Sequence, residues 1–330
     1  MQPSVVRILM TGEGHMAIGG RNLDSGRREL CRRIVIGAVA AGLCTREVFA
    51  RKDAFKLKYI TASCMYGRMN LEVILSEVAK TAARHIDIWP EPHGNQREQI
   101  EQMGRDAFAA MLEQHGVKLG ILTHFDLGPF VLQQEMSVAR ELGGSMIICG
   151  TRGPRNLKGQ ELKAAVVEFA EKMKPHVAAA EQAQIVIGIE NHADSLVESA
   201  DSMRWLAELA PSRHIGIALA PYHLEQDPIL IAGLIRDLGS RLVHFYAWQH
   251  GMGCHKKLPK EQELLQLPGR GKLDFVPILS ALKSIKYDGW TEIFMHPVPR
   301  GIPIWPTAAE VTSEINRSRR YLEACLRKVS

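Results

Sequence analysis

"HIGIALAPYHLEQD", residues 214–227, joins an apolar run to a proline and then to a series of polar residues. The run IGIALA (215–220) is apolar throughout, which is typical of a strand that is buried on both faces, as in a parallel sheet. His223 follows three residues after this strand, close to Glu225 and Asp227. A histidine at such a place is either an ordinary packing residue or part of an active site, and the rest of the chain distinguishes the two.

The same pattern, an apolar segment followed by a helical one, recurs along the chain from Phe55 onward. Strands that are apolar nearly throughout, each followed by a helix of ten or more residues, indicate parallel βαβ units. Eight such units in about 270 residues favour a closed (β/α)8 TIM barrel, as a single domain over residues 51–330. No G-x-G-x-x-G follows the first strand and no P-loop is present, so the signatures of nucleotide-binding sheets are missing. The expected strands cover residues 57–63, 85–89, 117–124, 145–150, 185–191, 215–220, 241–248 and 289–295.

Long helical patterns and one long loop complete the expected barrel. Helices are expected over about residues 97–114, 160–182 and 307–327, and the longest irregular stretch covers residues 249–272. A loop of that length inside a compact domain is usually functional, for example as a binding loop.

Residues 1–50 do not continue the repeat and have the layout of an export signal. Paired arginines at 27–28 and 32–33 precede an apolar run over 34–43, and Val-Phe-Ala at 48–50 resembles a cleavage site. The arginine pairs indicate a twin-arginine-like signal peptide with an N-terminal extension, and therefore export to the bacterial periplasm. The apolar run of about ten residues is too short to span a membrane, so no stable membrane insertion is expected. The alternative is a short N-terminal arm on a cytoplasmic protein.

The net charge of the chain depends on these first fifty residues. The whole chain carries 41 Lys and Arg against 36 Asp and Glu, a formal net charge of +5. Residues 1–50 hold seven of the arginines and four of the acids, so the remainder has 34 basic and 32 acidic residues, a net charge of +2. A chain this close to neutrality lacks the basic face that nucleic acids require, and no nucleic-acid partner is expected. The four cysteines after residue 50 form no C-x-x-C pair, so neither a zinc knuckle nor a redox motif is indicated.

Histidines concentrate where the expected strands end. The active site of a (β/α)8 barrel lies at the C-terminal ends of its strands, and six of the seven ends that carry polar residues contain a histidine. Imidazoles that converge with a carboxylate indicate a divalent metal such as Zn, Mn, Fe or Co. The histidines are His93, His124, His192, His223, His250 with His255, and His296, and the acids beside them are Glu91, Asp126, Glu190, Asp194 and Glu225.

Glu190 is the strongest candidate among these residues. It ends the apolar strand VIGIE, where a carboxylate is costly to bury unless it is paired or binds a metal. The expected catalytic residues are Glu190, His223 and His296. The expected metal ligands are Glu190, His223, His250 and His296, although each histidine has an ordinary alternative as a loop residue or a turn cap. The residues expected to bind substrate are His192, Tyr246, Arg300, Glu91 and His124.

The order of the units and three strand ends resemble the xylose isomerase-like TIM-barrel family. These strand ends are IGIENH (187–192), APYHL (220–224) and GWTEIFMHP (289–297), and the resemblance covers about residues 55–328. The family contains sugar and sugar-phosphate isomerases and epimerases, inosose dehydratases and the family-2 AP endonucleases. The resemblance implies an enzyme that acts on a small carbohydrate, while the sequence leaves open whether the chain forms a homo-oligomer.

The resemblance also implies a metal site, from which this chain departs. Sugar-converting members hold Mn²⁺, Co²⁺ or Mg²⁺ with Glu, Asp, His and Glu from strands five to eight. Glu190 matches the first ligand and His223 matches a substrate-binding histidine, whereas Ala220 stands where the aspartate is expected. Tyr246 stands at the usual histidine ligand and His296 replaces the final glutamate. The predicted cofactor is therefore a divalent metal (Mn, Co, Zn or Mg) in an altered ligand set.

Three functions follow from these residues and the resemblance. The first is a divalent-metal-dependent sugar isomerase or epimerase that acts at the carbon next to a carbonyl. Leu196 stands six residues beyond Glu190, where epimerases of the family place a second glutamate, so a two-carboxylate proton relay is poorly supported. The second function is a lyase or hydratase on an exported keto-sugar or keto-glycoside, which would share the first step, proton abstraction next to a carbonyl. The third function is a non-catalytic barrel that binds a sugar or a partner through a degenerate metal site.

Overall fold

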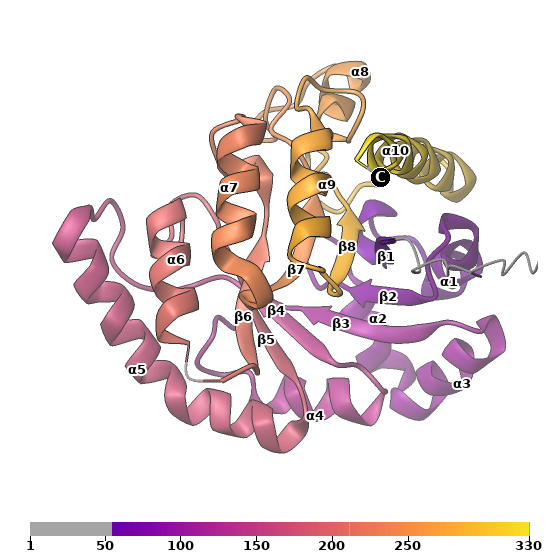
Figure 1. The fold of residues 1–330 in the computed structure, drawn as a ribbon. Helices are drawn as coiled ribbons and strands as arrows, with labels where there is room; N and C mark the ends of the chain where they lie inside the picture. Colours follow the sequence, from indigo (N-terminus) through magenta and orange to yellow (C-terminus); the bar gives the residue numbers. More distant parts are fainter. Residues whose placement is uncertain (1–54, 211, 330) are drawn as a thin grey trace, which may run out of the picture. The chain divides into compact units, whose positions relative to one another are not determined.

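A computed structural model describes residues 55–210 and 212–329, which form a closed barrel of eight parallel strands (Figure 1). The strands follow one another around the barrel in chain order, and the last strand pairs with the first to close it. This confirms the predicted (β/α)8 TIM barrel. The strands are β1 (Lys58–Ala62), β2 (His85–Ile88), β3 (Lys118–Thr123), β4 (Met146–Cys149), β5 (Val186–Glu190), β6 (Ile215–Leu219), β7 (Leu242–Ala247) and β8 (Trp290–Ile293).

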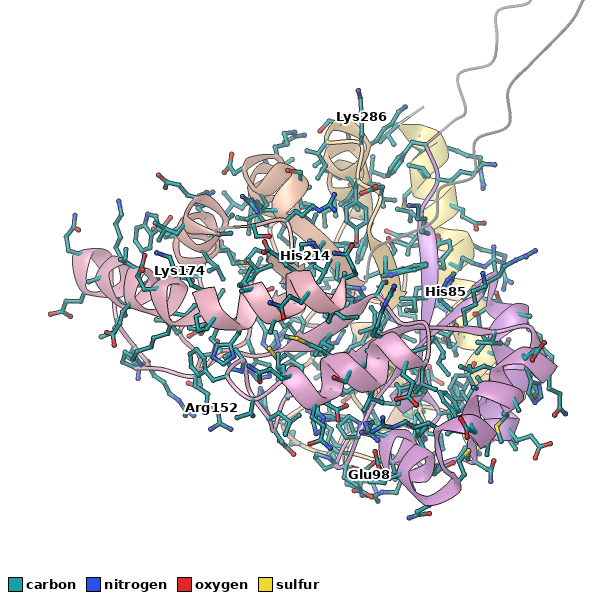
Figure 2. All side chains as sticks on the ribbon, turned by 90° about the horizontal axis from the view of Figure 1, so that it is seen from below. His85, Glu98, Arg152, Lys174, His214 and Lys286 are labelled. Atoms are coloured by element: carbon teal, nitrogen blue, oxygen red, sulfur yellow. The ribbon has the colours of Figure 1, made fainter. Side chains whose placement is uncertain are left out.

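Helices surround the barrel, and their apolar faces pack on the strands (Figure 1). Side chains fill the space between strands and helices, while Lys286 extends from the outer surface (Figure 2). The helices are α1 (Leu71–Val78), α2 (Gln96–Met103), α3 (Arg105–His115), α4 (Gln133–Glu141), α5 (Gly159–Ala183), α6 (Ala200–Leu209), α7 (Pro228–Leu238), α8 (Lys260–Glu263), α9 (Phe275–Ser284) and α10 (Ala308–Lys328).

One predicted helix is wrong, because the structure contains two shorter helices in its place. The sequence predicts a single helix over residues 97–114, but Gly104 separates α2 from α3 there. Gly104 has a φ of +85°, which lies outside the helical region and is accessible to glycine at little cost. The loop predicted over residues 249–272 also contains the short helix α8.

The stretch around His223 is fixed on both sides. A 3₁₀ turn over Pro221–His223 follows β6 almost directly. Asp227 caps α7, because its side chain accepts hydrogen bonds from the N–H groups of Ile229 and Leu230 at 2.7 and 3.2 Å. The chain between the strand end and the capped helix therefore holds His223 at the C-terminal end of the barrel, which is called the mouth below.

The predicted export signal stays a prediction, because residues 1–50 lie outside the described residues. Among the helices of residues 55–210 and 212–329, none combines the length and the apolar composition of a membrane span. The four cysteines after residue 50 are buried and carry free thiols.

Candidate active site

The ends of β5 and β6 bring Glu190 and His223 together at the mouth. His223 Nε2 lies 3.8 Å from Glu190 Oε1, and the two side chains are only 5% and 4% exposed. The N–H of Ala193 donates a hydrogen bond to His223 Nδ1 at 3.3 Å, so the neutral ring carries its proton on Nε2, facing Glu190. His223 Nε2 has no hydrogen-bond partner among the described residues. A ligand atom near these two groups could therefore accept a hydrogen bond from His223 Nε2 and contact the carboxyl group of Glu190.

Burial sets the charge of this pair. Removal from water raises the pKa of the Glu190 carboxyl well above its ordinary value, and the nearby Glu292 raises it further, while the Tyr246 phenol lowers it. Burial also lowers the pKa of His223 to about 3, helped by the neighbouring imidazoles of His192 and His250. Burial therefore favours the neutral form of both groups.

Two pairs of imidazoles line the mouth. The rings of His192 and His223 have centroids 4.3 Å apart, and those of His93 and His296 are stacked with centroids 4.5 Å apart. Burial lowers the pKa of His93 to about 4, with a contribution from Arg300, and burial lowers the pKa of His296 well below its ordinary value. The neutral rings of His93, His223 and His296 can donate and accept hydrogen bonds without the cost of burying a charge.

Aromatic side chains form a buried cluster beside these imidazoles. Trp89 stacks on Phe294 with ring centroids 5.1 Å apart, and Tyr222 stacks on Trp248 at 4.0 Å. The ring of His296 meets Trp89 and Trp248 edge-on. This packing supports the imidazoles. The aromatic cluster was not predicted from the sequence, because its rings come from different strands.

A second polar cluster lies fully buried inside the barrel. His244 Nε2 is 3.2 Å from Glu292 Oε2, and neither side chain is exposed. Asp87 Oδ2 accepts hydrogen bonds from Trp89 Nε1 and Thr123 Oγ1, both at 2.7 Å. Burial is the largest cause that raises the pKa of both Asp87 and Glu292. Neither acid was predicted as a site residue, although each interrupts an apolar strand as Glu190 does.

We expect the substitution Glu292→Gln to change how stability depends on pH. The raised pKa means that folded protein keeps a proton that the unfolded chain releases above about pH 4.3, so wild-type stability falls as the pH rises. The variant lacks this loss, so its free energy of unfolding relative to wild type should rise by up to about 1.4 kcal/mol per pH unit. Urea denaturation of both proteins from pH 5 to pH 8 measures this, and parallel pH curves would contradict it.

The other predicted residues lie at different depths around the mouth. The Tyr246 phenol is buried next to Glu190. Arg300 donates to the carbonyl oxygens of Pro297 and Cys254 at 2.8 and 3.3 Å, so its guanidinium joins the strand-eight loop to the loop after β7.

Three predicted residues make their closest polar contacts with groups other than Glu190 and His223. Glu91 is exposed and paired with Arg68, whose Nε donates to Glu91 Oε1 at 2.9 Å. His124 Nδ1 lies 3.8 Å from Glu135 Oε2, on a carboxylate already held by an arginine. His250 is exposed, and its Nδ1 lies 3.3 Å from the Tyr222 carbonyl oxygen.

The donor groups do not fit a divalent metal as the structure places them. Within residues 55–210 and 212–329, no three His, Cys, Asp or Glu side chains are arranged to hold a metal ion. Ala220 and Tyr246 occupy two positions where the family resemblance expects an aspartate and a histidine. Of the four predicted ligands, Glu190 and His223 face each other, whereas His250 contacts Tyr222 and His296 stacks on His93.

Solved structures with a similar fold include sugar epimerases. An IolI protein with a bound zinc atom is 17% identical, with a TM-score of 0.63, and the match covers 83% of this chain and 99% of that chain. D-psicose 3-epimerase with D-tagatose from Clostridium cellulolyticum H10 is 17% identical, with a TM-score of 0.61 and coverage of 82% and 99%. L-ribulose 3-epimerase is 14% identical, with a TM-score of 0.60 and coverage of 83% and 97%. At these identities the similarity establishes the fold.

Sequence comparison gives the family directly. No curated protein matches the chain significantly. The sequence profile of the family described as "Xylose isomerase-like TIM barrel" matches residues 75–321, which is most of the chain. The closed parallel barrel and this match together mean that the chain belongs to the xylose isomerase-like TIM-barrel family.

Proposed function

We propose that this protein is a sugar isomerase or epimerase-like enzyme that moves a proton at a carbon next to a carbonyl group. The observation that carries the proposal is the buried pair at the mouth, where His223 Nε2 faces Glu190 Oε1 across 3.8 Å. Membership of the family and the similarity to sugar epimerases support a carbohydrate substrate. The imidazoles beside the pair, which can donate and accept hydrogen bonds, suit the hydroxyl groups of a small sugar.

In the proposed reaction Glu190 is the base and His223 is the hydrogen-bond donor. The ionised carboxylate of Glu190 removes the proton from the carbon, and the C–H electron pair forms the double bond of an enediolate. The Nε2–H of His223 donates a hydrogen bond to the former carbonyl oxygen, where the negative charge develops. Glu190 then returns the proton to carbon, and the carbonyl group re-forms. A base with a raised pKa suits this task, because its ionised form is strongly basic.

The residues favour proton transfer on one face of the sugar. Leu196 and His296 occupy the two positions where epimerases of the family would carry a second glutamate. A single carboxylate can take a proton from one carbon and return it to the neighbouring carbon. Transfer of the hydroxyl proton of the sugar to the former carbonyl oxygen then completes the conversion of an aldose into a ketose. A lyase or hydratase would share the first step and differ in releasing a group from the neighbouring carbon.

A panel of free aldoses, ketoses and keto-sugars, incubated with purified protein, tests this proposal. Chromatography of the products should show an isomer of one sugar, formed at a rate that depends on enzyme concentration. Release of water or of an aglycone would instead identify the lyase or hydratase alternative. No conversion of any sugar, with folded protein at high concentration, would contradict the proposal.

The resemblance predicts a divalent metal cofactor, and metal analysis of the purified protein tests this prediction. The metal content is measured before and after incubation with Mn²⁺, Co²⁺, Zn²⁺ and Mg²⁺. If a metal binds through the predicted residues, we expect about one ion per chain and its loss in Glu190→Gln. A protein that retains none of the four ions would contradict the predicted cofactor.

We expect Tyr246→Phe to shift the pH dependence of the reaction. The Tyr246 phenol stabilises ionised Glu190, so its removal should raise the pKa of Glu190 and move the acidic limb of the pH–rate profile to higher pH. On that limb, loss of the favourable interaction of the phenol with ionised Glu190 should lower the rate about fivefold, while the rate at high pH recovers. Equal loss at every pH would mean that Tyr246 acts in some other way.

A further inference from the structure

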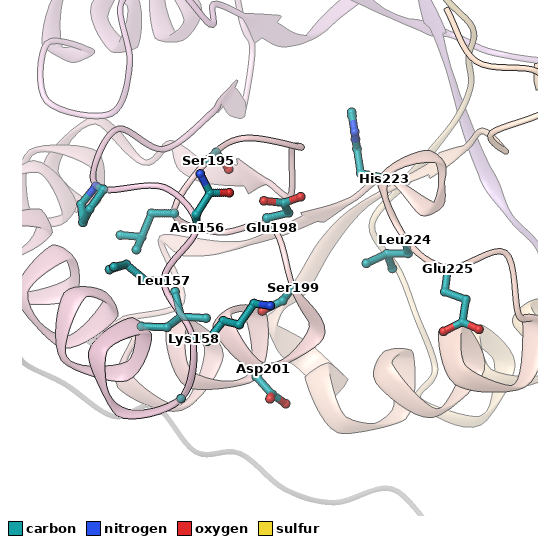
Figure 3. A pocket seen from close by; sticks show the side chains of 14 residues that line it. Asn156, Leu157, Lys158, Ser195, Glu198, Ser199, Asp201, His223, Leu224 and Glu225 are labelled. Carbon is teal, nitrogen blue, oxygen red and sulfur yellow. The ribbon is translucent and has the colours of Figure 1, made fainter.

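A large cavity lies beside the Glu190–His223 pair. Its volume is about 610 Å³, and His223 is one of the residues that line it. The other lining residues come from the loop after β4 and the start of α5, from the loop after β5 and the start of α6, and from the turn after β6. Figure 3 shows Asn156 and Glu198 on one side of this cavity and Leu224 and Glu225 on the other. His223 therefore borders both this cavity and Glu190.

Four of the polar side chains that line the cavity have no partner among the described residues. The side chains of Asn156, Lys158, Glu198 and Glu225 form no hydrogen bond or ion pair with the rest of residues 55–210 and 212–329. Asn156 also has a φ of +61°, a left-handed conformation that costs energy for most residues and that asparagine tolerates. Free amide, ammonium and carboxylate groups on one cavity wall suit a ligand with many hydroxyl groups.

The balance of charge argues against an anionic ligand. Glu198 and Glu225 contribute two unpaired carboxylates to the lining, against the single ammonium of Lys158, while Asp201 is paired with Arg204. A phosphate or carboxylate group on the ligand would be repelled by the acids. Leucine side chains at 157, 162, 196 and 224 supply apolar surface between the polar groups, as the two faces of a sugar ring require.

The size of the cavity fits an additional sugar ring. Binding pockets for small molecules measure about 300–1,000 Å³, and this cavity lies within that range although His223 is the one member of the Glu190–His223 pair that lines it. A monosaccharide reacting at the pair would leave most of the cavity unfilled.

We propose that this cavity is a subsite for a second, uncharged sugar unit, so that the preferred substrate is a disaccharide or similar glycoside. The sugar that reacts lies at Glu190 and His223, and the attached unit binds between Asn156, Glu198 and Glu225. This inference rests on the proposed function for the site of reaction, whereas binding in the cavity requires no catalysis.

Calorimetry with the full chain tests the subsite. Wild-type protein is titrated with disaccharides of glucose, galactose and fructose and with the constituent monosaccharides. We expect at least one disaccharide to bind about tenfold more tightly than either of its monosaccharides. Asn156→Gly, which keeps the backbone conformation, and Glu198→Ala should each remove about tenfold of this gain and leave monosaccharide binding unchanged. Glu208→Ala, an exposed glutamate on α6 outside the cavity, is the matched control and should change neither affinity.

Several results would overturn the inference. Disaccharides that bind no more tightly than monosaccharides, or cavity variants that weaken both equally, would mean that no second sugar binds there. Competition by inorganic phosphate or a sugar phosphate, lost in Lys158→Ala, would identify an anion site instead. Failure of the proposed function is recognised separately, because a disaccharide would then bind in the cavity without being converted.

Discussion

Replacement of Glu190 by glutamine is expected to lower kcat about 10²–10⁴-fold, with the protein still folded. Glutamine has nearly the same shape as a protonated glutamate, so the aromatic and histidine side chains around it should keep their positions. The amide cannot take a proton from carbon, so the step that depends on Glu190 is lost. Because burial makes ionised Glu190 costly in the folded state, the variant should be at least as stable as wild type near neutral pH.

Turnover of the converted sugar and thermal unfolding by circular dichroism measure the two expectations together. Glu208→Gln, the same change on the exposed surface of α6, is the matched control and should keep full activity. A Glu190→Gln variant with wild-type kcat would rule out Glu190 as the base. A variant that loses activity because it unfolds would contradict the expected stability.

Loss of the Arg97–Glu135 ion pair is expected to have the largest effect on stability. Arg97 Nε and Nη2 donate to the two carboxylate oxygens of Glu135, both at 2.8 Å, and the side chains are 8% and 6% exposed. Arg97→Met leaves a buried carboxylate without its partner, which costs about 3–5 kcal/mol of unfolding free energy. Urea denaturation at pH 7 measures this loss.

The pH dependence of the same variant distinguishes the ion pair from simple packing. Burial alone would raise the pKa of Glu135, but Arg97 and His124 lower it to about 2. The pair therefore stabilises the fold above about pH 4.3, and this stability is lost as the pH falls toward 2. The difference between wild type and Arg97→Met should shrink on acidification. Arg105→Met breaks an exposed pair with Glu141 and should cost less than about 1 kcal/mol, so equal losses in the two variants would contradict the argument.

The fold could be predicted from the sequence because its signal repeats. Each apolar strand and following helix independently indicates a βαβ unit, so an error at one element, such as the break at Gly104, leaves the barrel unchanged. Glu190 could be identified as a candidate because a carboxylate at the end of an apolar strand is costly to bury unless it is paired or binds a ligand. His223 could be placed at the mouth because parallel strands end on the same side.

The rest of the candidate site depends on distances between strands, which a linear pattern does not contain. His124 and Glu91 stand at strand ends like His223, yet each contacts a neighbouring charged side chain away from the Glu190–His223 pair. The acids Asp87 and Glu292 also stand in apolar strands and are fully buried, but a position within a strand does not indicate a site at the mouth. The metal ligands were transferred from a resemblance, and their side chains are not arranged around one point.

The proton transfer at Glu190 is tested most directly with a sugar that carries deuterium on the carbon next to its carbonyl group. Wild-type protein should move this deuterium to the neighbouring carbon or to solvent at the rate of conversion, as followed by NMR. Glu190→Gln should leave the deuterium in place over the same time. Deuterium that leaves equally fast in the variant, or that stays in place while wild-type protein converts the sugar, would contradict proton transfer by Glu190.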